Sequence, residues 1–544
     1  MSQIVGVDVG GTFTDLISFD SNSDTVSIAK VLSTPENQAF GVMKALETAE
    51  ANLQSVETLI HGTTVTTNAL LERKISRIGL ITTKGFRDVL ELGRRTRPKP
   101  YGMTGVFECI IPREFRLEVR ERVDSDGEII EPLNENDVAK ALKLLLDNGT
   151  ESLIIHFLHS YKNDIHERIA ADIAKDIWPN SFITCGSELV TEFREYERGT
   201  TAAINAAVQP VLHNYIKRLQ HQLKEEKYSK DLLVMQGNGG TVSSSIVSDE
   251  AVKTVMSGPA SGVMAAAYTS MQCGFSRVVT YDMGGTSCDV GLIVDGIPQV
   301  TSELEIEYAM PIHVPMVDVH SIGAGGGSLA WVNDAGLLQV GPESAGAQPG
   351  PICYGRGGTK PTITDANLVL GRLNPESLLS VDNPVSLETV RSKMIEDVGR
   401  NLGFKDVEET ASAIIRIANM NMAGSLRLVS LARGYDPRDF ALFAFGGAGP
   451  LHAVSLAAEL GIPKVLVPMR PGITNAVGCV VADVRHDYVN TINVPLNQVD
   501  MDQVHDIFAS QIRAGKEIIA SEGIDIEGIV IIHQVDMQFQ GQTH

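Results

Sequence analysis

Residues 8–15 read DVGGTFTD and residues 282–289 read DMGGTSCD, so one short motif occurs twice in this chain of 544 residues. Asp, Gly, Gly, Thr and Asp occupy the same places in both copies. Apolar runs flank each copy on both sides, at residues 4–7, 16–19, 277–281 and 290–294. A strand, two glycines and a second strand are typical of a β-hairpin, because glycine readily adopts the positive φ angles of a tight turn. The repeat therefore predicts two equivalent hairpins in a duplicated α/β fold.

Both predicted hairpins carry groups that suit phosphate. Two glycines and a threonine expose successive backbone N–H groups and a hydroxyl, and such a concave surface binds anions. The aspartate that ends each first strand, Asp8 or Asp282, can hold a hydrated Mg²⁺, because hard cations prefer carboxylate and water oxygens. A strand follows the glycines, whereas a Rossmann fingerprint requires a helix there. The motif thus predicts one nucleotide held between two halves of the chain.

A third glycine segment, FGGAGP at residues 445–450, follows an apolar run and precedes a helical pattern at 451–460. Pro450 suits the first turn of that helix. A glycine-rich corner between a strand and a helix lets a flat ring approach the backbone, and the helix N-terminus favours negative charge. Gly446, Gly447 and Gly449 are therefore expected to contact adenosine.

With these three segments the sequence resembles the actin, sugar-kinase and heat-shock-chaperone ATPase superfamily. It resembles one branch more closely, the hydantoinase A/5-oxoprolinase family, from about residue 4 to the last residue. The other stretches that carry this resemblance are HGTTVTTNAL at 61–70, SGPASG at 257–262, GAGGGS at 323–328, SAGAQPGP at 344–351 and TDAN at 364–367. The resemblance implies an α/β fold of duplicated actin-like (ribonuclease H-like) lobes, with mixed sheets flanked by helices and a nucleotide cleft between the lobes.

Members of this family look like ATP-dependent enzymes that open cyclic amides such as N-methylhydantoin, 5-oxoproline and lactams. The resemblance implies ATP and Mg²⁺ as cofactors, phosphorylation of the carbonyl oxygen, and a hydantoinase B-type subunit as partner in a hetero-oligomer. Two alternatives stay open. The chain can be the ATP-activating subunit of a ketone carboxylase of the acetone or acetophenone type, which forms an enol phosphate. It can also be a non-enzymatic nucleotide switch.

The candidate site residues follow from the motifs and the resemblance together. The candidate catalytic residues are Asp8, Thr12, His61, Asp282 and Thr286. The candidate nucleotide contacts are Gly10, Gly11, Thr12, Gly284, Gly285, Thr286, Gly446, Gly447 and Gly449, and the candidate metal ligands are Asp8 and Asp282. His61 precedes several threonines at a strand-to-helix junction, where it either faces substrate or is structural. Asp15 and Asp289 either orient water or stabilise their hairpins.

Several polar residues outside these motifs allow two interpretations. Asp318 and His320 lie two apart on an apparent strand and project to one face, which favours a core hydrogen bond over a metal site. Asp365 and Asn367 precede a helical run, so a helix cap is favoured over a substrate contact. A group of arginines lacks any phosphate-binding spacing and is expected to form a solvated or interface surface: Arg94, Arg95, Arg97 and Arg113.

Composition limits the possible partners. The 45 basic and 67 acidic residues give a net charge of −22, which argues against nucleic acid or an anionic membrane as principal partner. Six scattered cysteines without a Cys-x-x-Cys pair are typical of a reducing compartment. The first apolar run begins at residue 4, and no apolar stretch approaches the ~20 residues that span a bilayer. We therefore expect a cytoplasmic protein.

The expected organisation has three parts. Residues 1–185 form the N-terminal lobe, residues 200–490 form the second lobe, and residues 491–544 begin a C-terminal domain. Members of the family look longer, so we expect this chain to be truncated, processed or split. Four segments carry further expectations: an irregular excursion at 93–122, a helix at 192–222 broken near Pro210, an irregular middle at 323–358, and a helix at 502–521 followed by a strand at 529–539.

Overall fold

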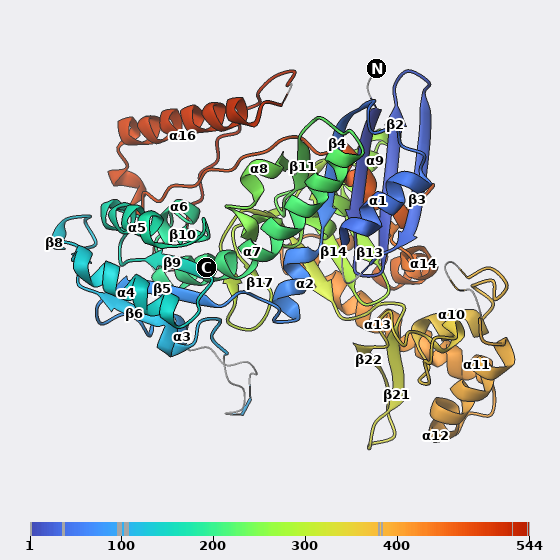
Figure 1. Cartoon of the computed structure of the whole chain (residues 1–544). Coiled ribbons are helices and arrows are strands. Elements are labelled where there is room, and N and C mark those ends of the chain that lie inside the picture. Colours follow the sequence, from blue (N-terminus) through green and yellow to red (C-terminus); the bar gives the residue numbers. More distant parts are fainter. Residues whose placement is uncertain are drawn as a thin grey trace.

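The structure is a computed structural model that describes residues 3–34, 38–94, 101–102, 108–378, 381, 384–524, 526–540 and 542. Two mixed sheets form its centre, and we call the parts built around them the first and the second lobe (Figure 1). Helices α9 (Ser257–Gln272) and α15 (Thr474–Val481) pack against each other, and α15 also packs on strands of the first lobe.

The first-lobe sheet has the strand order β12-β11-β4-β1-β2-β3. Its strands are β1 (Gln3–Val9), β2 (Phe13–Asp20), β3 (Thr25–Leu32), β4 (Val56–Thr63), β11 (Leu232–Met235) and β12 (Thr241–Ser243). β1 pairs antiparallel with β2 and parallel with β4. Because β11 and β12 belong to this sheet, the expected lobe boundary near residue 200 is wrong. Strands that lie far apart in sequence complete the first lobe.

The second-lobe sheet repeats this arrangement. Its order is β15-β14-β13-β23-β24, and β20 also pairs with β14. The strands are β13 (Val278–Met283), β14 (Cys288–Val294), β15 (Ile297–Pro298), β20 (Val319–Ile322), β23 (Ala441–Phe445) and β24 (Lys464–Leu466). β13 pairs antiparallel with β14 and parallel with β23, as β1 does with β2 and β4. The predicted hairpins and the predicted duplication of an α/β fold are confirmed.

The register of the two hairpins is equivalent residue by residue. Asp8 lies opposite Asp15 in the first, and Asp282 lies opposite Asp289 in the second. Central strands β1 and β13 are buried almost throughout, since helices or neighbouring segments cover both faces of each sheet. The sequence repeat therefore corresponds to a repeat in three dimensions.

An inserted parallel sheet with the order β10-β9-β5-β6 lies beside the first lobe. Its strands are β5 (Ile78–Thr83), β6 (Arg116–Val119), β9 (Ser152–His156) and β10 (Ile183–Cys185), with the helices α4 (Glu135–Asp147) and α5 (Ile165–Ile177). The irregular excursion expected at 93–122 is thus only partly correct. β6 is a short edge strand that contains Arg116 and Glu118, so it lacks the apolar run that identifies a buried strand.

Helices of very different length join and cover the sheets. They include α1 (Gln38–Thr48), α2 (Val65–Leu71), α7 (Glu195–Glu225), α13 (Val407–Leu431), α14 (Gly449–Leu460) and α16 (Met501–Glu522). α7 continues through Pro210, so the expected break there is wrong. The remaining turns of α7 pack along the first-lobe core, and this burial offsets the backbone hydrogen bond that proline cannot donate. None of the described helices is long and apolar enough to cross a membrane.

Two further expectations about irregular and extended segments are wrong. The middle at 323–358 contains a hairpin of β21 (Ser328–Val332) and β22 (Leu338–Ser344), which projects from the second lobe (Figure 1). Its glycines lie mainly in the flanking loops and in the turn, where Gly336 has a φ of 74°. The strand expected at 529–539 does not form, because these residues have no regular secondary structure, although the preceding helix α16 is confirmed. A strand forms only where another strand accepts its backbone hydrogen bonds.

Candidate functional site

The turns of the two hairpins close in the same way. Gly10 N donates to Phe13 O at 2.9 Å, and Gly284 N donates to Ser287 O at 3.0 Å. The expected positive φ angles are wrong, because none of the four turn glycines has a φ in the left-handed region. A Cβ at Gly11 or Gly285 would have open space around it. Glycine therefore serves to leave the turn backbone uncovered, which is what an approaching anion requires.

Different segments hold the two turns in place. In the first lobe, Ser33 N donates to Thr12 O at 2.9 Å, and Ser33 Oγ donates to Gly10 O at 2.7 Å. In the second lobe, a glycine loop before β21 lies on the turn, and Gly327 N donates to Gly285 O at 2.7 Å. A Cβ at Gly325 would lie 2.6 Å from the Gly285 carbonyl. The glycine-rich middle of the chain is thus a support for the second hairpin.

The third glycine segment lies against the same hairpin. Ala448 N donates to Met283 O at 2.9 Å, and α14 begins at Gly449. Gly446 has a φ of 80°, and a Cβ there would lie 2.2 Å from Asp282 Oδ1. The predicted strand, corner and helix at 440–460 are therefore confirmed as structure, and Gly446 fits directly beside Asp282.

Asn475 joins the two candidate metal ligands. Its Nδ2 donates to Asp282 Oδ2 at 3.3 Å, and its amide also lies near enough to Asp8 to lower the pKa of that carboxyl in part, against the effect of burial. Burial raises the pKa of Asp8 and of Asp282 to about 7, and repulsion from Asp15 on Asp8, and from Asp289, Asp8 and Asp15 on Asp282, adds to the rise. The hairpins of the two lobes thus bring their carboxylates together. Asn475, at the start of α15, was missed in the sequence because its segment contains no recognisable motif.

The second aspartate of each hairpin has a different environment. In the first lobe, Lys30 Nζ lies 2.6 Å from Asp15 Oδ1 and sits over the Phe13 ring. In the second lobe, Asp289 lies opposite Ser321 of β20 and has no ion pair among the described residues; burial raises its pKa to about 6, and Ser321 lowers it in part. Lys30 was missed in the sequence, although its position on the strand that pairs with β2 was a usable signal.

The oxygen atoms around this point suit a hydrated cation. Asp8 is only 4 % exposed, yet Asp8 Oδ1 and Asn475 Oδ1 have no hydrogen-bond partner among the described residues. A water bound to Mg²⁺ can donate to such acceptors, and Mg²⁺ commonly uses one or two carboxylates and keeps several waters. The described residues contain no group of three or more His, Cys, Asp or Glu side chains arranged to hold a metal. The residues therefore fit a cation held largely through water.

The structure places Thr12 and Thr286 in the hairpin turns but separates His61 from them. In the parallel pairing of β1 with β4, His61 lies opposite Val7, and Gly62 lies opposite Asp8. Successive residues of a strand point to opposite faces, so the side chains of His61 and Asp8 lie on different faces of the sheet. His61 Nε2 bonds Tyr215 Oη at 2.8 Å, and burial lowers the pKa of His61 to about 4. We therefore do not retain His61 as a catalytic candidate.

The other ambiguous residues have structural partners. Asp318 pairs with Arg433, and it lies 3.3 Å from His320, so this group is an ion-pair cluster. Asp365 forms a capping box with Thr362, the N-cap of α10 (Ile363–Val369), and also accepts hydrogen bonds from Ile352 N and Cys353 N, so its predicted part in a helix cap is confirmed, whereas the helix begins earlier than expected and contains Asn367. Asn367 contacts His452 at 3.3 Å.

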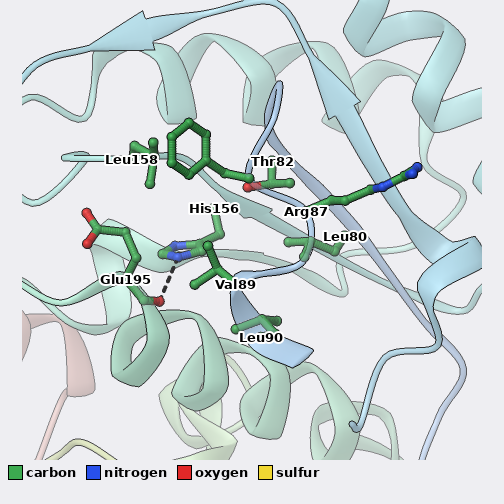
Figure 2. Close-up of a pocket in the computed structure, with 9 residues that line it drawn as sticks. Leu80, Thr82, Arg87, Val89, Leu90, His156, Leu158 and Glu195 are labelled. Atoms are coloured by element: carbon green, nitrogen blue, oxygen red, sulfur yellow. Dashed lines mark hydrogen bonds between the residues drawn. The ribbon is translucent and has the colours of Figure 1, made fainter. Parts of the chain in front are cut away.

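A narrow pocket lies at the carboxyl ends of β5 and β9 (Figure 2). Its walls include Leu80, Leu90 and Leu158, and His156 Nε2 lies 3.0 Å from Glu195 O. Burial, with Arg198 nearby, lowers the pKa of His156 to about 3, so the imidazole is neutral. No sequence motif marks this pocket, because its residues come from segments that meet only in the folded chain.

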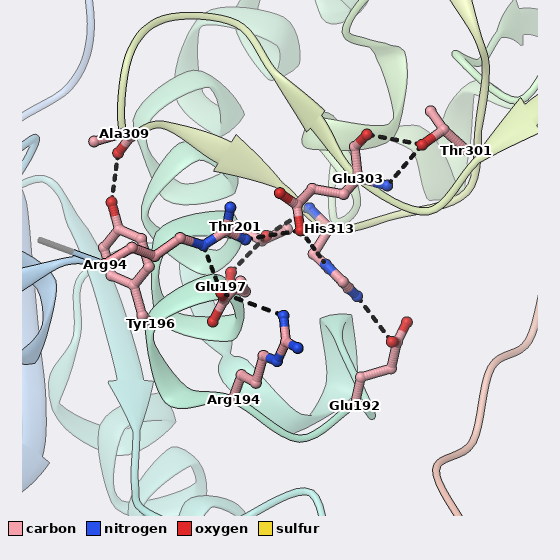
Figure 3. Close-up of polar contacts among 10 residues, drawn as sticks. All are labelled: Arg94, Glu192, Arg194, Tyr196, Glu197, Thr201, Thr301, Glu303, Ala309 and His313. Atoms are coloured by element: carbon pink, nitrogen blue, oxygen red, sulfur yellow. Dashed lines mark hydrogen bonds and ion pairs between the residues drawn. The ribbon is translucent and has the colours of Figure 1, made fainter. Parts of the chain in front are cut away.

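A polar network connects the start of α7 with the segment at 301–313 (Figure 3). Arg94 contacts Glu197 at 2.8 Å and Glu303 at 2.7 Å, so the expectation of a solvated or interface arginine does not hold for this residue. Burial opposes the charge of His313, but hydrogen bonds with Glu192 and Glu303 raise its pKa to about 9. Arg113 pairs with Asp88 on the surface, whereas Arg95 and Arg97 lie outside the described residues.

Comparisons with known proteins agree along almost the whole chain. Residues 198–488 match the family described as hydantoinase/oxoprolinase, and residues 4–178 match the hydantoinase/oxoprolinase N-terminal region. The chain is 34 % identical to the caprolactamase subunit alpha of Pseudomonas jessenii, over 99 % of this chain and 79 % of that protein. It is 33 % identical to the acetophenone carboxylase gamma subunit of Aromatoleum aromaticum, over 99 % of this chain and 77 % of that protein. The crystal structure of the ATP-dependent caprolactamase from Pseudomonas jessenii superposes with a TM-score of 0.85 and 33 % identity, covering 97 % of this chain and 77 % of that one.

Proposed function

Because this chain belongs to the hydantoinase/oxoprolinase family, we propose that it binds ATP between its two hairpins and phosphorylates the carbonyl oxygen of a small cyclic amide. The observation that carries this proposal is the convergence of Asp8 and Asp282, from duplicated hairpins, on one amide side chain. In this proposal the chain is the phosphorylating subunit of a cytoplasmic hetero-oligomer, and a hydantoinase B-type subunit completes ring opening.

The chemistry requires activation because an amide carbonyl is a poor electrophile. Transfer of the γ-phosphoryl group to the carbonyl oxygen releases ADP, and water can then add to the activated carbon. Expulsion of the protonated amine from this adduct breaks the C–N bond and opens the ring, and the acyl phosphate that remains is hydrolysed by a second water to carboxylate and phosphate. Phosphoryl transfer depends mainly on positioning and on neutralisation of charge. When bound, Mg²⁺ would supply part of that neutralisation.

The residues of this chain supply the remaining contacts. Backbone N–H groups of the two turns and the hydroxyls of Thr12 and Thr286 donate to phosphate oxygens. Asp8 and Asp282 accept hydrogen bonds from the water shell of the cation. The corner formed by Gly446, Gly447 and Gly449 faces adenosine. The uncovered turn glycines and the two unpartnered oxygens near Asn475 support this assignment.

The caprolactamase relative favours a lactam or a similar ring as substrate. The acetophenone carboxylase relative supports a second candidate function, in which the same site converts a ketone to its enol phosphate for carboxylation. The two reactions share the phosphoryl donor and differ in the acceptor. Dependence of product formation on bicarbonate therefore distinguishes them.

The test is release of ADP by this chain together with its partner subunit, with Mg²⁺, across caprolactam, 5-oxoproline, hydantoin, acetone and acetophenone. Release stimulated by an amide without bicarbonate supports the amide hydrolase and identifies the ring. Release that requires both ketone and bicarbonate supports the carboxylase. ATP binding without stimulation by any of these compounds would contradict both and leave a nucleotide switch.

A further inference from the structure

The short segment that leads into α15 contacts both lobes near the hairpins. Gly446 N, in the second lobe, donates to Pro471 O at 2.9 Å. Lys30 Nζ, in the first lobe, donates to Gly472 O at 3.0 Å while it pairs with Asp15. Asn475 follows three residues later. The backbone at 471–472 is therefore hydrogen-bonded to Gly446, beside Asp282, and to Lys30, which pairs with Asp15 of the first hairpin.

Close packing of α15 against α9 fixes where Asn475 lies. A Cβ at Gly478 would lie 1.8 Å from Ser261 O, so the two helix backbones are in direct contact. A Cβ at Gly262 would lie 2.5 Å from Asn475 Oδ1. A Cβ at Gly6, on β1, would likewise lie 2.5 Å from Ala476 O. The Asn475 side chain therefore has little freedom to leave the space between Asp8 and Asp282.

The side chain in this place is neutral, and its donors match the two carboxylates. An asparagine amide has two N–H donors, enough for one hydrogen bond to each aspartate. A lysine or arginine at this position would neutralise the carboxylates and compete with a divalent cation. An amide can donate to the carboxylates without adding charge, and Asp8 Oδ1 stays unpartnered among the described residues.

We propose that Asn475 is a positioning residue that holds the carboxylates of Asp8 and Asp282 at one separation, so that both bind the water shell of the same divalent cation. This inference rests on the proposed function, because it concerns the cation that accompanies ATP. Groups that orient metal-binding carboxylates typically change metal affinity about 10–100-fold when they are removed.

The experiment compares the wild-type protein with Asn475→Ala and with the control Asn419→Ala. Asn419 is also a half-buried helical asparagine of the second lobe, and its Oδ1 lies 2.7 Å from His452 Nδ1 rather than near the aspartates. Two quantities are measured: the Mn²⁺ dissociation constant in the presence of ADP, by electron paramagnetic resonance, and the Mg²⁺ concentration that half-saturates ATP turnover. For Asn475→Ala we expect both to rise about 10–100-fold, and for Asn419→Ala we expect wild-type values.

Folding is checked by thermal unfolding in EDTA, and Asn475→Ser replaces Asn475→Ala if the alanine variant does not fold. Wild-type Mn²⁺ affinity and spectrum in a folded Asn475 variant would overturn the positioning role while the proposed function stands. A wild-type protein that binds neither ADP nor Mn²⁺–ADP would contradict the proposed function itself, and the positioning role with it.

Discussion

The two hairpins share one backbone and differ in charge. Both place an aspartate at the end of a central strand with a second aspartate opposite it. In the first lobe Lys30 neutralises the second aspartate, whereas in the second lobe Ser321 stands in the neighbouring strand opposite Asp289. The first turn is held by Ser33, and the second by a glycine loop from a distant part of the sequence. Duplication has therefore preserved the turn geometry, while the side chains around it have diverged.

This difference gives the two lobes separate tasks in the proposed site. At the first hairpin the ammonium group of Lys30 balances the charge of Asp15, so little excess negative charge remains there. At the second hairpin the charge of Asp289 is not neutralised and lies close to Asp282. The two carboxylates repel each other, so a bound cation would stabilise them more than those of the first hairpin. The following changes test how far the lobes are equivalent.

The largest effect is expected where the hairpins are the same. Asp8→Asn and Asp282→Asn should each lower ATP turnover about 10²–10³-fold, because each removes one carboxylate from the proposed cation site. Steady-state ADP release at saturating Mg²⁺ measures this. If one variant keeps wild-type turnover, the two lobes do not contribute equally and the shared site is wrong. Thermal unfolding in EDTA serves as the control, and neither variant should be less stable at pH 7, since each loses a buried carboxyl with a raised pKa.

A smaller effect on stability is expected from alanine substitutions at Gly325, which packs on the second turn, and at Gly11 in the first turn. Gly325→Ala places a Cβ against the backbone of the second turn, so we expect the free energy of unfolding to fall by about 1–3 kcal/mol, with a loss of turnover. Gly11→Ala meets open space, so its stability should stay within about 0.5 kcal/mol of wild type.

Calorimetric titration with Mg²⁺–ADP completes this test. Gly11→Ala should weaken binding about tenfold, because a methyl group then stands where phosphate approaches. Unchanged affinity in Gly11→Ala would show that the first turn does not contact the nucleotide.

The pH dependence of stability should reveal the shared carboxylates. The pKa values of Asp8 and Asp282 are raised to about 7 and that of Asp289 to about 6, from 3.8 in the unfolded chain. The folded state therefore binds more protons between these values, and stability falls as pH rises from about 4 to about 7. In EDTA we expect a loss over this range of about 3 kcal/mol from Asp8 and from Asp282 each, and of about 2 kcal/mol from Asp289. Unfolding by urea at several pH values measures it, and added Mg²⁺ should flatten the profile if the carboxylates bind it.

The smallest expected effect concerns the charge difference itself. Lys30→Met leaves Asp15 without its ion pair and should lower the free energy of unfolding by about 1–2 kcal/mol at pH 7. Ser321→Lys places a cation opposite Asp289 and should raise stability by about 0.5–1 kcal/mol in EDTA. Urea unfolding at low salt measures both changes. If both substitutions leave the free energy of unfolding nearly unchanged, the charge of Lys30 does not distinguish the lobes.

The parts of the fold that were predicted correctly are local. The hairpins at 8–15 and 282–289 and the corner at 445–450 each form within a short stretch, so their apolar runs and glycines identify them directly. The cap at Asp365 is local for the same reason. The segments predicted wrongly depend on distant partners: β6 and the hairpin β21–β22 have weak patterns, and residues 529–539 have a strong strand pattern but no described strand beside them.

The sequence by itself determined that two Asp-x-Gly-Gly-Thr hairpins and a glycine corner exist, and the family resemblance followed from the same residues. Only the tertiary structure decided that His61 faces Tyr215, that Lys30 pairs with Asp15 and that Asn475 lies between Asp8 and Asp282. The hydrogen bond between Asn475 and Asp282 joins positions 193 residues apart. No local preference for helix or strand encodes such a contact. It forms only when α9 packs against α15 and both lobes pack around them, because this packing sets the position of Asn475 relative to the hairpins.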